Sequence, residues 1–309
     1  MVEGLNTSSA KPTVGVLGMG NMGRALAARL LEQDYEVFVW NRSSRDLSVL
    51  YGLGAHLLTT LVGLWTHVQV VITFVADDAA LRTVCCGPEG VLSAPVEDGL
   101  LVDMSTVSPK VSEEIAIAAS SVGVAYLRSP VSGNPLVLAA GNLTLVVSGP
   151  EPVFERAGEL LSAIGPTVLY VGDGERSRLV KLAINAGLAI TTELLAELVL
   201  LTERYGLDRA TFLGVLGQSV LGSPFVRYKT EGLNERNYAA TFTTALLAKD
   251  LRLALDLADE AELTLPTVAL VSSLVEDALD GYADVDFAAL LPRLQRAHGH
   301  DPDIAPTSA

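Results

Sequence analysis

Lys181 and Asn185 are a pair of residues whose types suit acid–base chemistry. They lie four residues apart in a proline-free stretch, Gly172 to Asp208, that predicts one long helix, so both side chains fall on one helix face. Beside a carbonyl group that accepts hydride, a lysine ammonium can donate the balancing proton, and a nearby amide can hold the lysine or the substrate. A lone lysine in an apolar helix can also simply extend to the surface, so its role depends on the motifs around it.

A glycine-rich segment near the N-terminus predicts a dinucleotide site. Gly18-x-Gly20-x-x-Gly23 follows the apolar run Pro12–Leu17, opens a helical pattern and precedes a second predicted strand at Glu36–Asn41. In this context the glycines allow a tight turn and a close approach of backbone N–H groups to a pyrophosphate at the helix N-terminus. We therefore expect cofactor contacts from Gly18, Met19, Gly20, Asn21, Met22 and Gly23.

The residues after the second predicted strand indicate which dinucleotide binds. NAD sites place Asp or Glu here to hold the ribose 2′-hydroxyl, whereas this chain has Asn41, Arg42 and Ser43, and Asp46 comes later. A guanidinium can hold a 2′-phosphate through paired hydrogen bonds, with Asn41 and Ser43 as auxiliary donors. We expect NADP(H); the alternative is that Arg42 is only a solvated charge.

Two further segments follow predicted strands, where doubly wound folds bind their ligands. DMSTVSP, residues 103–109, offers hydroxyls and backbone donors. SPVSGNP, residues 129–135, offers a turn whose N–H groups can hold a carboxylate. Taken singly, each segment can equally be a helix cap or a turn.

The elements that must position these residues follow from the apolar patterning. Strand-length apolar runs alternate with helical spacing, which predicts a doubly wound α/β domain over residues 12–171. The rest is helical, which predicts an all-α domain over residues 172–296, joined by the long helix, with flexible tails at 1–11 and 297–309. The expected C-terminal helices are Glu175–Tyr205, Asp208–Gln218, Phe242–Ala261, Thr267–Gly281 and Val285–Gln295.

Composition argues against several classes of protein. The net charge of −15 opposes binding to a phosphate backbone, so we expect no nucleic-acid partner. The two cysteines are adjacent and the four histidines are scattered, so we expect no disulfide and no metal site. Because we find neither a signal-peptide pattern nor an uncharged run of bilayer length, we expect a cytoplasmic protein without a membrane segment.

Five segments in family order resemble the β-hydroxyacid dehydrogenases, which include 3-hydroxyisobutyrate dehydrogenase and the glyoxylate/succinic semialdehyde reductases. They are GVLGMGNMG, DMSTVSP, SPVSGNP with the following GNLTLVVSG, VGDGERSRLVKLAINAG, and FTTALLAKDLRLA. The resemblance covers residues 12–292. It implies an oxidoreductase with a Rossmann-type domain and a helical domain that packs across subunits in a homodimer or homotetramer.

The resemblance also implies roles for individual residues. Lys181 matches the catalytic lysine of the family, and Asn185 matches its asparagine beside the substrate. Ser132, Gly133 and Asn134 fall in the segment that holds the substrate carboxylate. The positions expected at the cofactor are Val75, Ala76, Thr106 and Lys249.

Departures from the family pattern leave the substrate open. Arg128-Ser129 stands where the family usually has an acidic or small residue, and Asn134-Pro135 replaces the usual glycine and its neighbour. We expect hydride transfer between NADP(H) and a small carbonyl or 3-hydroxy acid, with Lys181 as general acid or base. An imine reductase or reductive aminase is an alternative, although those enzymes usually replace the lysine. A cofactor-binding protein without activity is a third.

Overall fold

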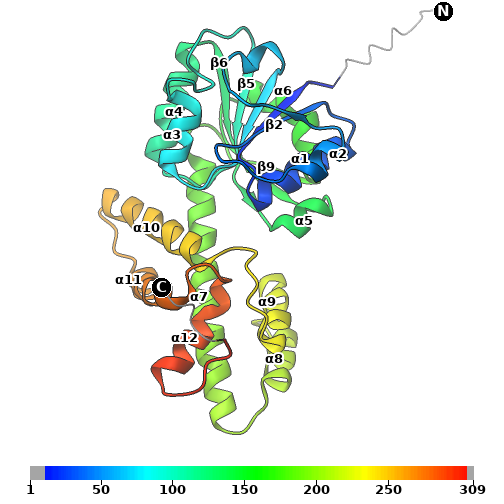
Figure 1. Cartoon of the computed structure of the whole chain (residues 1–309). Helices are drawn as coiled ribbons and strands as arrows, with labels where there is room; N and C mark the ends of the chain where they lie inside the picture. The colour runs from blue at the N-terminus through cyan, green and yellow to red at the C-terminus, as the bar shows by residue number, and fades with distance from the viewer. Residues whose placement is uncertain (1–10, 305–309) are drawn as a thin grey trace, which may run out of the picture. The chain divides into compact units, whose positions relative to one another are not determined.

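The computed structural model describes residues 11–304, which divide into two units between Lys181 and Leu182 (Figure 1). This division lies ten residues further along the chain than the predicted one after residue 171. The reason is that the first turn of the long helix belongs to the first unit. There the Ser177 hydroxyl lies 2.8 Å from the Ser148 hydroxyl.

The first unit is built on a six-stranded parallel sheet with the strand order β3-β2-β1-β4-β5-β6. The order changes direction at β1, which pairs with β2 on one side and with β4 on the other. Doubly wound folds bind ligands at the carboxyl ends of strands beside such a switch point. The strands are β1 (Val14–Leu17), β2 (Val37–Trp40), β3 (His56–Leu57), β4 (Val70–Thr73), β5 (Gly99–Asp103) and β6 (Val124–Arg128).

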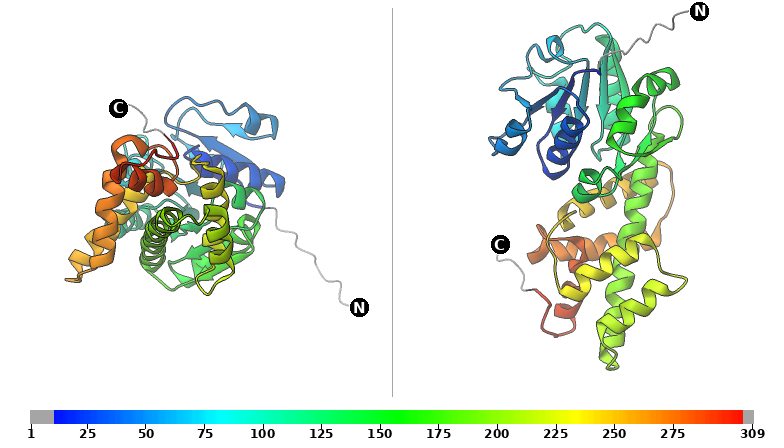
Figure 2. Two further views of the ribbon diagram at one scale, coloured as in Figure 1. Left: turned by 90° about the horizontal axis from the view of Figure 1, so that it is seen from below. Right: turned by 90° about the vertical axis from the view of Figure 1, so that its right-hand side faces the viewer.

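Helices cover both faces of this sheet, as Figures 1 and 2 show. Val70 and Ile72 of β4 pack on the face covered by α1 and α6, and Val71 packs on the face covered by α3 and α4. Burial on both faces explains why the strands read as continuous apolar runs. The helices are α1 (Asn21–Glu32), α2 (Ser48–Gly52), the 3-10 helix η1 (Leu64–Thr66), α3 (Asp78–Cys86), α4 (Pro109–Ser121), α5 (Pro135–Ala139) and α6 (Glu151–Ile164).

The last strands of the first unit form a separate three-stranded sheet. β7 (Val131–Ser132) is antiparallel to β8 (Thr144–Val147), which is parallel to β9 (Thr167–Tyr170). An antiparallel bridge between Arg128 and Ser148 links the end of β6 to the end of β8. Residues 143–148 and 167–171 are apolar runs of strand length, but this pattern could not show that β8 and β9 leave the main sheet.

The second unit is helical, with a core shared by all its helices. Its first helix, α7 (Arg176–Arg204), is about 44 Å long at about 1.5 Å per residue. α7 ends where Gly206 adopts φ +81° and the Leu207 N–H donates to Thr202 O, a left-handed cap. The other elements are α8 (Arg209–Gln218), α9 (Pro224–Glu235), α10 (Thr244–Glu260), α11 (Pro266–Tyr282), the 3-10 helix η2 (Phe287–Ala289) and α12 (Leu290–Ala297).

Two features of this unit differ from expectation. Helix α9 packs on α8 (Figure 2). It was not predicted, because a buried lysine, Lys229, occupies one of its inward positions and breaks the apolar spacing. Residues 298–304 were expected in a flexible tail, and that expectation is wrong for this described part. The side chain of Asp303 is buried and accepts hydrogen bonds from Arg209, Tyr238 and Gln295.

Helix α7 is long and apolar enough to cross a membrane by length and composition alone. It nevertheless carries charged and polar side chains that are buried and paired. Arg178, Asn185 and Glu193 are buried, and each pairs with a side chain from outside the helix. The expected absence of a membrane segment stays a prediction.

Candidate active site

Two of the three glycines after β1 are required by the fold, and the third leaves open space. Gly18 has φ +102°, and a Cβ there would lie 2.3 Å from the carbonyl oxygen of Phe74, at the end of the neighbouring β4. A Cβ on Gly23 would lie 1.9 Å from the Gly18 carbonyl oxygen. A Cβ on Gly20 would meet nothing within 4 Å. The loop is therefore tight on its inner side and open at Gly20.

The N-terminus of α1 is suited to bind an anion. Gly20 occupies the N-cap position, and no described side chain caps it or places a carboxylate in the first turn. Uncapped N–H groups and the positive end of the helix dipole form a ready site for a pyrophosphate. These residues thus fit the predicted dinucleotide, held by the loop from Gly18 to Gly23.

Asn41 connects this loop to the residues after β2. Its Oδ1 accepts a hydrogen bond of 2.9 Å from the Met19 N–H, and its Nδ2 donates to the Ser43 carbonyl oxygen at 2.8 Å. Both ends of the amide are thus engaged within the chain, so Asn41 shapes the loop. The auxiliary phosphate contact predicted for it stays a prediction.

Arg42 and Arg45 are both exposed in this region, and Arg42 directly follows Asn41. Its guanidinium makes no hydrogen bond or ion pair to another residue in the described part of the chain. The nearest following carboxylate, Asp46, accepts a 2.9 Å hydrogen bond from the Ser48 N–H, which lowers the pKa of Asp46. Asp46 is therefore committed to a turn before α2, and the 2′-phosphate contact predicted for Arg42 stays a prediction.

The segments after β4 and β5 lie against each other. The Val75 N–H donates to the buried Ser105 hydroxyl at 2.9 Å, which places Ala76 and Thr106 on neighbouring loops. Ser108 caps α4 by accepting from the Val111 N–H at 3.1 Å. The serines of the DMSTVSP segment are thus structural, and Thr106, half-buried, is its candidate ligand contact.

In the SPVSGNP segment, Gly133 and Asn134 have structural roles. Ser132 ends β7, and Gly133 follows with φ +139°. A Cβ on Gly133 would lie 2.8 Å from Leu143 Cδ1, so only glycine fits without a shift. Asn134 caps α5 through its Oδ1, which accepts from the Leu136 and Val137 N–H groups at 3.0 Å. The substrate roles of these three residues stay predictions.

Asp103 connects the loops around the candidate site, a role that the pattern of the sequence did not reveal. Its Oδ1 accepts from the Thr73 hydroxyl at 2.6 Å and from the Ser105 N–H at 3.1 Å. Its carbonyl oxygen accepts from the Ser129 N–H at 2.8 Å, and its Oδ2 pairs with Arg178 of α7. The signal available in the sequence was a carboxylate that ends an otherwise apolar strand.

Lys181 and Asn185 lie one turn apart on α7, as predicted, with Lys181 closing the first unit and Asn185 in the second. Lys181 is half-buried, whereas Asn185 is 1% exposed and donates through Nδ2 to Asp250 Oδ2 on α10. Lys249 Nζ lies 3.0 Å from Asp250 Oδ1. Asp250 was not predicted as a site residue, although a carboxylate between Leu247 and Leu251 on an apolar helix face pointed to it.

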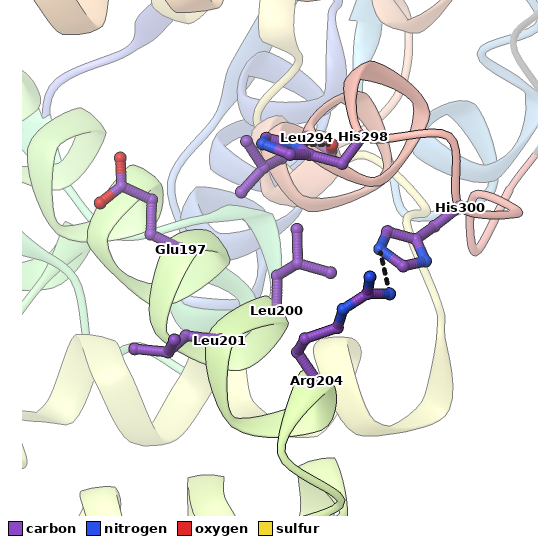
Figure 3. A pocket seen from close by; sticks show the side chains of 7 residues that line it. All are labelled: Glu197, Leu200, Leu201, Arg204, Leu294, His298 and His300. Carbon is purple, nitrogen blue, oxygen red and sulfur yellow. Dashed lines mark hydrogen bonds between the residues drawn. The ribbon is translucent and has the colours of Figure 1, made fainter.

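The second half of α7 lines a different hollow, drawn in Figure 3. This pocket of about 440 Å³ lies between α7 and the α12 end of the second unit, and Arg204 Nη1 and His300 Nε2 lie 3.5 Å apart across it. Its lining consists of Glu197, Leu200, Leu201, Arg204, Leu294, His298 and His300. None of these seven was predicted as a site residue.

No group of three or more His, Cys, Asp or Glu side chains within residues 11–304 is placed to hold a metal ion. Cys85 is buried, which raises the pKa of its thiol, and Cys86 is exposed; neither forms a disulfide. The absence of a metal site from the protein stays a prediction.

Comparison with known proteins agrees with this arrangement. Residues 13–172 match the NAD-binding domain of 6-phosphogluconate dehydrogenase, and residues 176–294 match the family described as NAD-binding of NADP-dependent 3-hydroxyisobutyrate dehydrogenase. The chain belongs to the β-hydroxyacid dehydrogenase family. The Rossmann and helical architecture and the oxidoreductase class predicted from the sequence are thereby confirmed.

Individual relatives of this β-hydroxyacid dehydrogenase cover nearly its whole length. The uncharacterized oxidoreductase YfjR of Bacillus subtilis is 33% identical over 90% of this chain and 98% of its own. The chloroplastic glyoxylate/succinic semialdehyde reductase 2 of Arabidopsis thaliana is 29% identical over 94% of this chain and 81% of its own.

Solved structures separate the two branches considered for this enzyme. The 3-hydroxyisobutyrate dehydrogenase of Mycobacterium tuberculosis, solved with L-serine, superposes with a TM-score of 0.82 at 25% identity, covering 93% of this chain and all of that one. An imine reductase from Pseudomonas sp. superposes with a TM-score of 0.62 at 21% identity, covering 92% of this chain and all of that one. The imine reductase therefore shares the fold but superposes less closely than the 3-hydroxyisobutyrate dehydrogenase.

Proposed function

We propose that this enzyme uses NADP(H) to interconvert a small carbonyl acid, of the semialdehyde or glyoxylate type, and the corresponding hydroxy acid. The observation that carries the proposal is the setting of Asn185, one turn after Lys181. The Asn185 Nδ2 donates a hydrogen bond to Asp250. The buried Oδ1 of Asn185 accepts no hydrogen bond from a described residue. Such an orphaned acceptor needs a donor from a ligand, a water or a neighbouring side chain.

The residues around Lys181 support a role as general acid or base. When bound, the nicotinamide supplies or accepts a hydride at C4. The Lys181 ammonium donates a proton to the carbonyl oxygen during reduction and takes it back from the hydroxyl during oxidation. The Asn185 Oδ1 accepts from that hydroxyl or from the ammonium, and Asp250 prevents the amide from turning round. Ser132 and the Gly133 N–H hold the substrate carboxylate.

Three features support the choice of NADP(H). Arg42 is exposed after β2, Asp46 is committed to its turn, and the position that a ribose-binding carboxylate takes in NAD sites holds Asn41. Gly18 and Gly23 keep the phosphate loop tight while Gly20 leaves it open. Each of these features lies within the first unit.

A substrate panel tests the proposal. We expect NADPH oxidation with succinic semialdehyde or glyoxylate to exceed oxidation with a cyclic imine such as 1-pyrroline by at least about tenfold in kcat/KM, because Lys181 matches proton transfer to an oxygen atom. The measurement is loss of NADPH absorbance at fixed enzyme concentration. Faster turnover of the imine would contradict the proposal and favour the imine reductase alternative, and NADPH binding without turnover of either class would favour a cofactor-binding protein.

A further inference from the structure

The first turn of α7 carries a buried guanidinium that the proposed mechanism does not use. Arg178 is 1% exposed. Its side chain pairs with Asp103 and donates to the Ser105 carbonyl oxygen, to the Ser112 hydroxyl at 3.3 Å and to the Tyr126 hydroxyl at 3.3 Å. Burial alone would lower the pKa of Arg178, but the Asp103 carboxylate raises it above its ordinary value, so the charge is kept.

The charges around Arg178 alternate in sign. Glu175 Oε2 lies 3.9 Å from Arg178 Nε, and Glu175 Oε1 accepts a 2.7 Å hydrogen bond from Arg128 Nε at the end of β6. The Arg128 guanidinium also lies 4.6 Å from the centre of the Tyr126 ring. Arg128, one of the departures from the family pattern, therefore has a partner within its own unit. We call Asp103, Arg128, Glu175 and Arg178 the charge chain.

The charge chain joins the start of α7 to the loops of the candidate site. Asp103 also holds Thr73 at the end of β4, Ser105 beside Thr106, and Ser129 at the start of the SPVSGNP segment. Ser177, next to Arg178, bonds to Ser148. Lys181 follows Ser177 by four residues and Arg178 by three, so it lies one helical turn beyond this anchor.

Net stability is a poor explanation for such an arrangement. A buried ion pair is often no more stabilising than apolar side chains of similar volume, because both charges must be desolvated. What paired charges do provide is a fixed geometry, and multiple hydrogen bonds from one planar guanidinium fix it closely. The division between the units directly after Lys181 is consistent with an anchor at this point.

We propose that Arg178 is a positioning residue that fixes Lys181 on the dinucleotide-binding unit, in register with the loops after β5 and β6. This proposal rests on the proposed function of Lys181 as general acid. It adds that the position of Lys181 should change when Arg178 is replaced, although Arg178 is not assigned a contact with substrate or cofactor.

The test compares two double variants. Arg178→Met with Asp103→Asn removes the pair without leaving an unpaired buried charge. Arg209→Met with Asp303→Asn does the same to a buried pair of the second unit and is the matched control. The readouts are thermal unfolding, NADPH binding by fluorescence, kcat and KM with the best carbonyl substrate, and NMR of reductively ¹³C-methylated enzyme. The chain has five lysines, Lys11, Lys110, Lys181, Lys229 and Lys249, and Lys181→Arg assigns the Lys181 signal.

We expect the Arg178/Asp103 variant to lose at least about tenfold in kcat, because small misplacement of a catalytic group costs up to about 10²-fold. NADPH affinity should stay within about twofold, and the methyl-lysine signal of Lys181 should shift or broaden. The control should leave kcat and that signal unchanged. Arg178→Lys alone should have a kcat between those of the double variant and the control, since an ammonium cannot reproduce the forked contacts of a guanidinium.

Three results would overturn the proposal: a kcat close to that of the unmodified enzyme, a reduced kcat with an unmoved Lys181 signal, or a loss of NADPH binding that shows a general failure of the first unit. The NMR signal separates this proposal from the function on which it rests. If Lys181→Ala kept full turnover but the Lys181 signal still shifted in the Arg178/Asp103 variant, the positioning would stand and the general-acid role would fall.

Discussion

At the residue scale, Arg42 and its neighbour Arg45 make the cofactor preference testable. Both are exposed in the segment after β2, but only Arg42 directly follows Asn41, which is tied to the phosphate loop. Arg42→Ala should weaken NADPH binding by at least about tenfold, because it removes charged hydrogen bonds worth about 1.5–3 kcal/mol, and should leave NADH binding nearly unchanged. Dissociation constants from fluorescence titration measure this, with Arg45→Ala as the control.

Equal losses for the two cofactors in Arg42→Ala would mean that this side chain does not read the 2′-phosphate. The residue types after β2 were enough to predict the candidate contact, because cofactor choice depends on local charge. They were not enough to predict the role of Asn41. Its bond to the Met19 N–H joins residues 22 positions apart, and such pairings depend on how loops fold back.

At the element scale, the start of α1 separates structural from functional glycines. Gly20 has extended backbone angles, and a Cβ there would meet only open space, unlike a Cβ on Gly18 or Gly23. Gly20→Ala should therefore change the free energy of unfolding by less than about 0.5 kcal/mol. It should weaken NADPH binding by at least about tenfold, because its methyl group enters the space where backbone approaches the pyrophosphate.

Chemical denaturation and NADPH titration of Gly20→Ala measure both effects, and Gly23→Ala, which should unfold far more easily, is the contrast. Tight NADPH binding by Gly20→Ala would contradict the placement of the pyrophosphate. The strand–loop–helix order around these glycines was predictable, because apolar runs and glycine spacing are local. Helix α9 was not, because the buried Lys229 depends on Asp286, a partner 57 residues away.

At the scale of the whole molecule, the C-terminal segment ties the helical unit together through Asp303. Burial alone would raise the pKa of Asp303, but hydrogen bonds from Arg209 and Tyr238 outweigh it and lower the pKa below its ordinary value. The charged carboxylate therefore stabilises the folded state above the ordinary pKa of aspartate, and this stabilisation is lost as pH falls through the lowered value.

Asp303→Asn should accordingly lower the free energy of unfolding by about 2 kcal/mol near neutral pH. The difference in unfolding free energy between the variant and the unmodified protein should shrink below about pH 4. Denaturant unfolding across that range measures it, with the exposed Asp301→Asn as the control. A difference that did not depend on pH would mean that the ion pair with Arg209 contributes nothing. The polar composition of the C-terminal segment predicted a flexible tail. It did not show that one carboxylate, Asp303, attaches this segment to the helical unit.

The division into an α/β unit and a helical unit was predictable at the same scale, because the period of the apolar pattern changes along the chain. That the first turn of α7 packs with the first unit was not predictable, because it depends on how Ser177 and Arg178 bond to distant strands. The pairing of Asn185 with Asp250 was hidden for the same reason, since 65 residues separate them.

The most direct test of the central claim is single-turnover NADPH oxidation by Lys181→Ala, with and without added ethylamine. We expect a rate at least about 10²-fold below that of the unmodified enzyme, NADPH affinity within about twofold, and partial recovery by the ethylammonium ion, which supplies the missing acid. A variant that oxidises NADPH at nearly the normal rate without amine would contradict the assignment of Lys181 as the general acid.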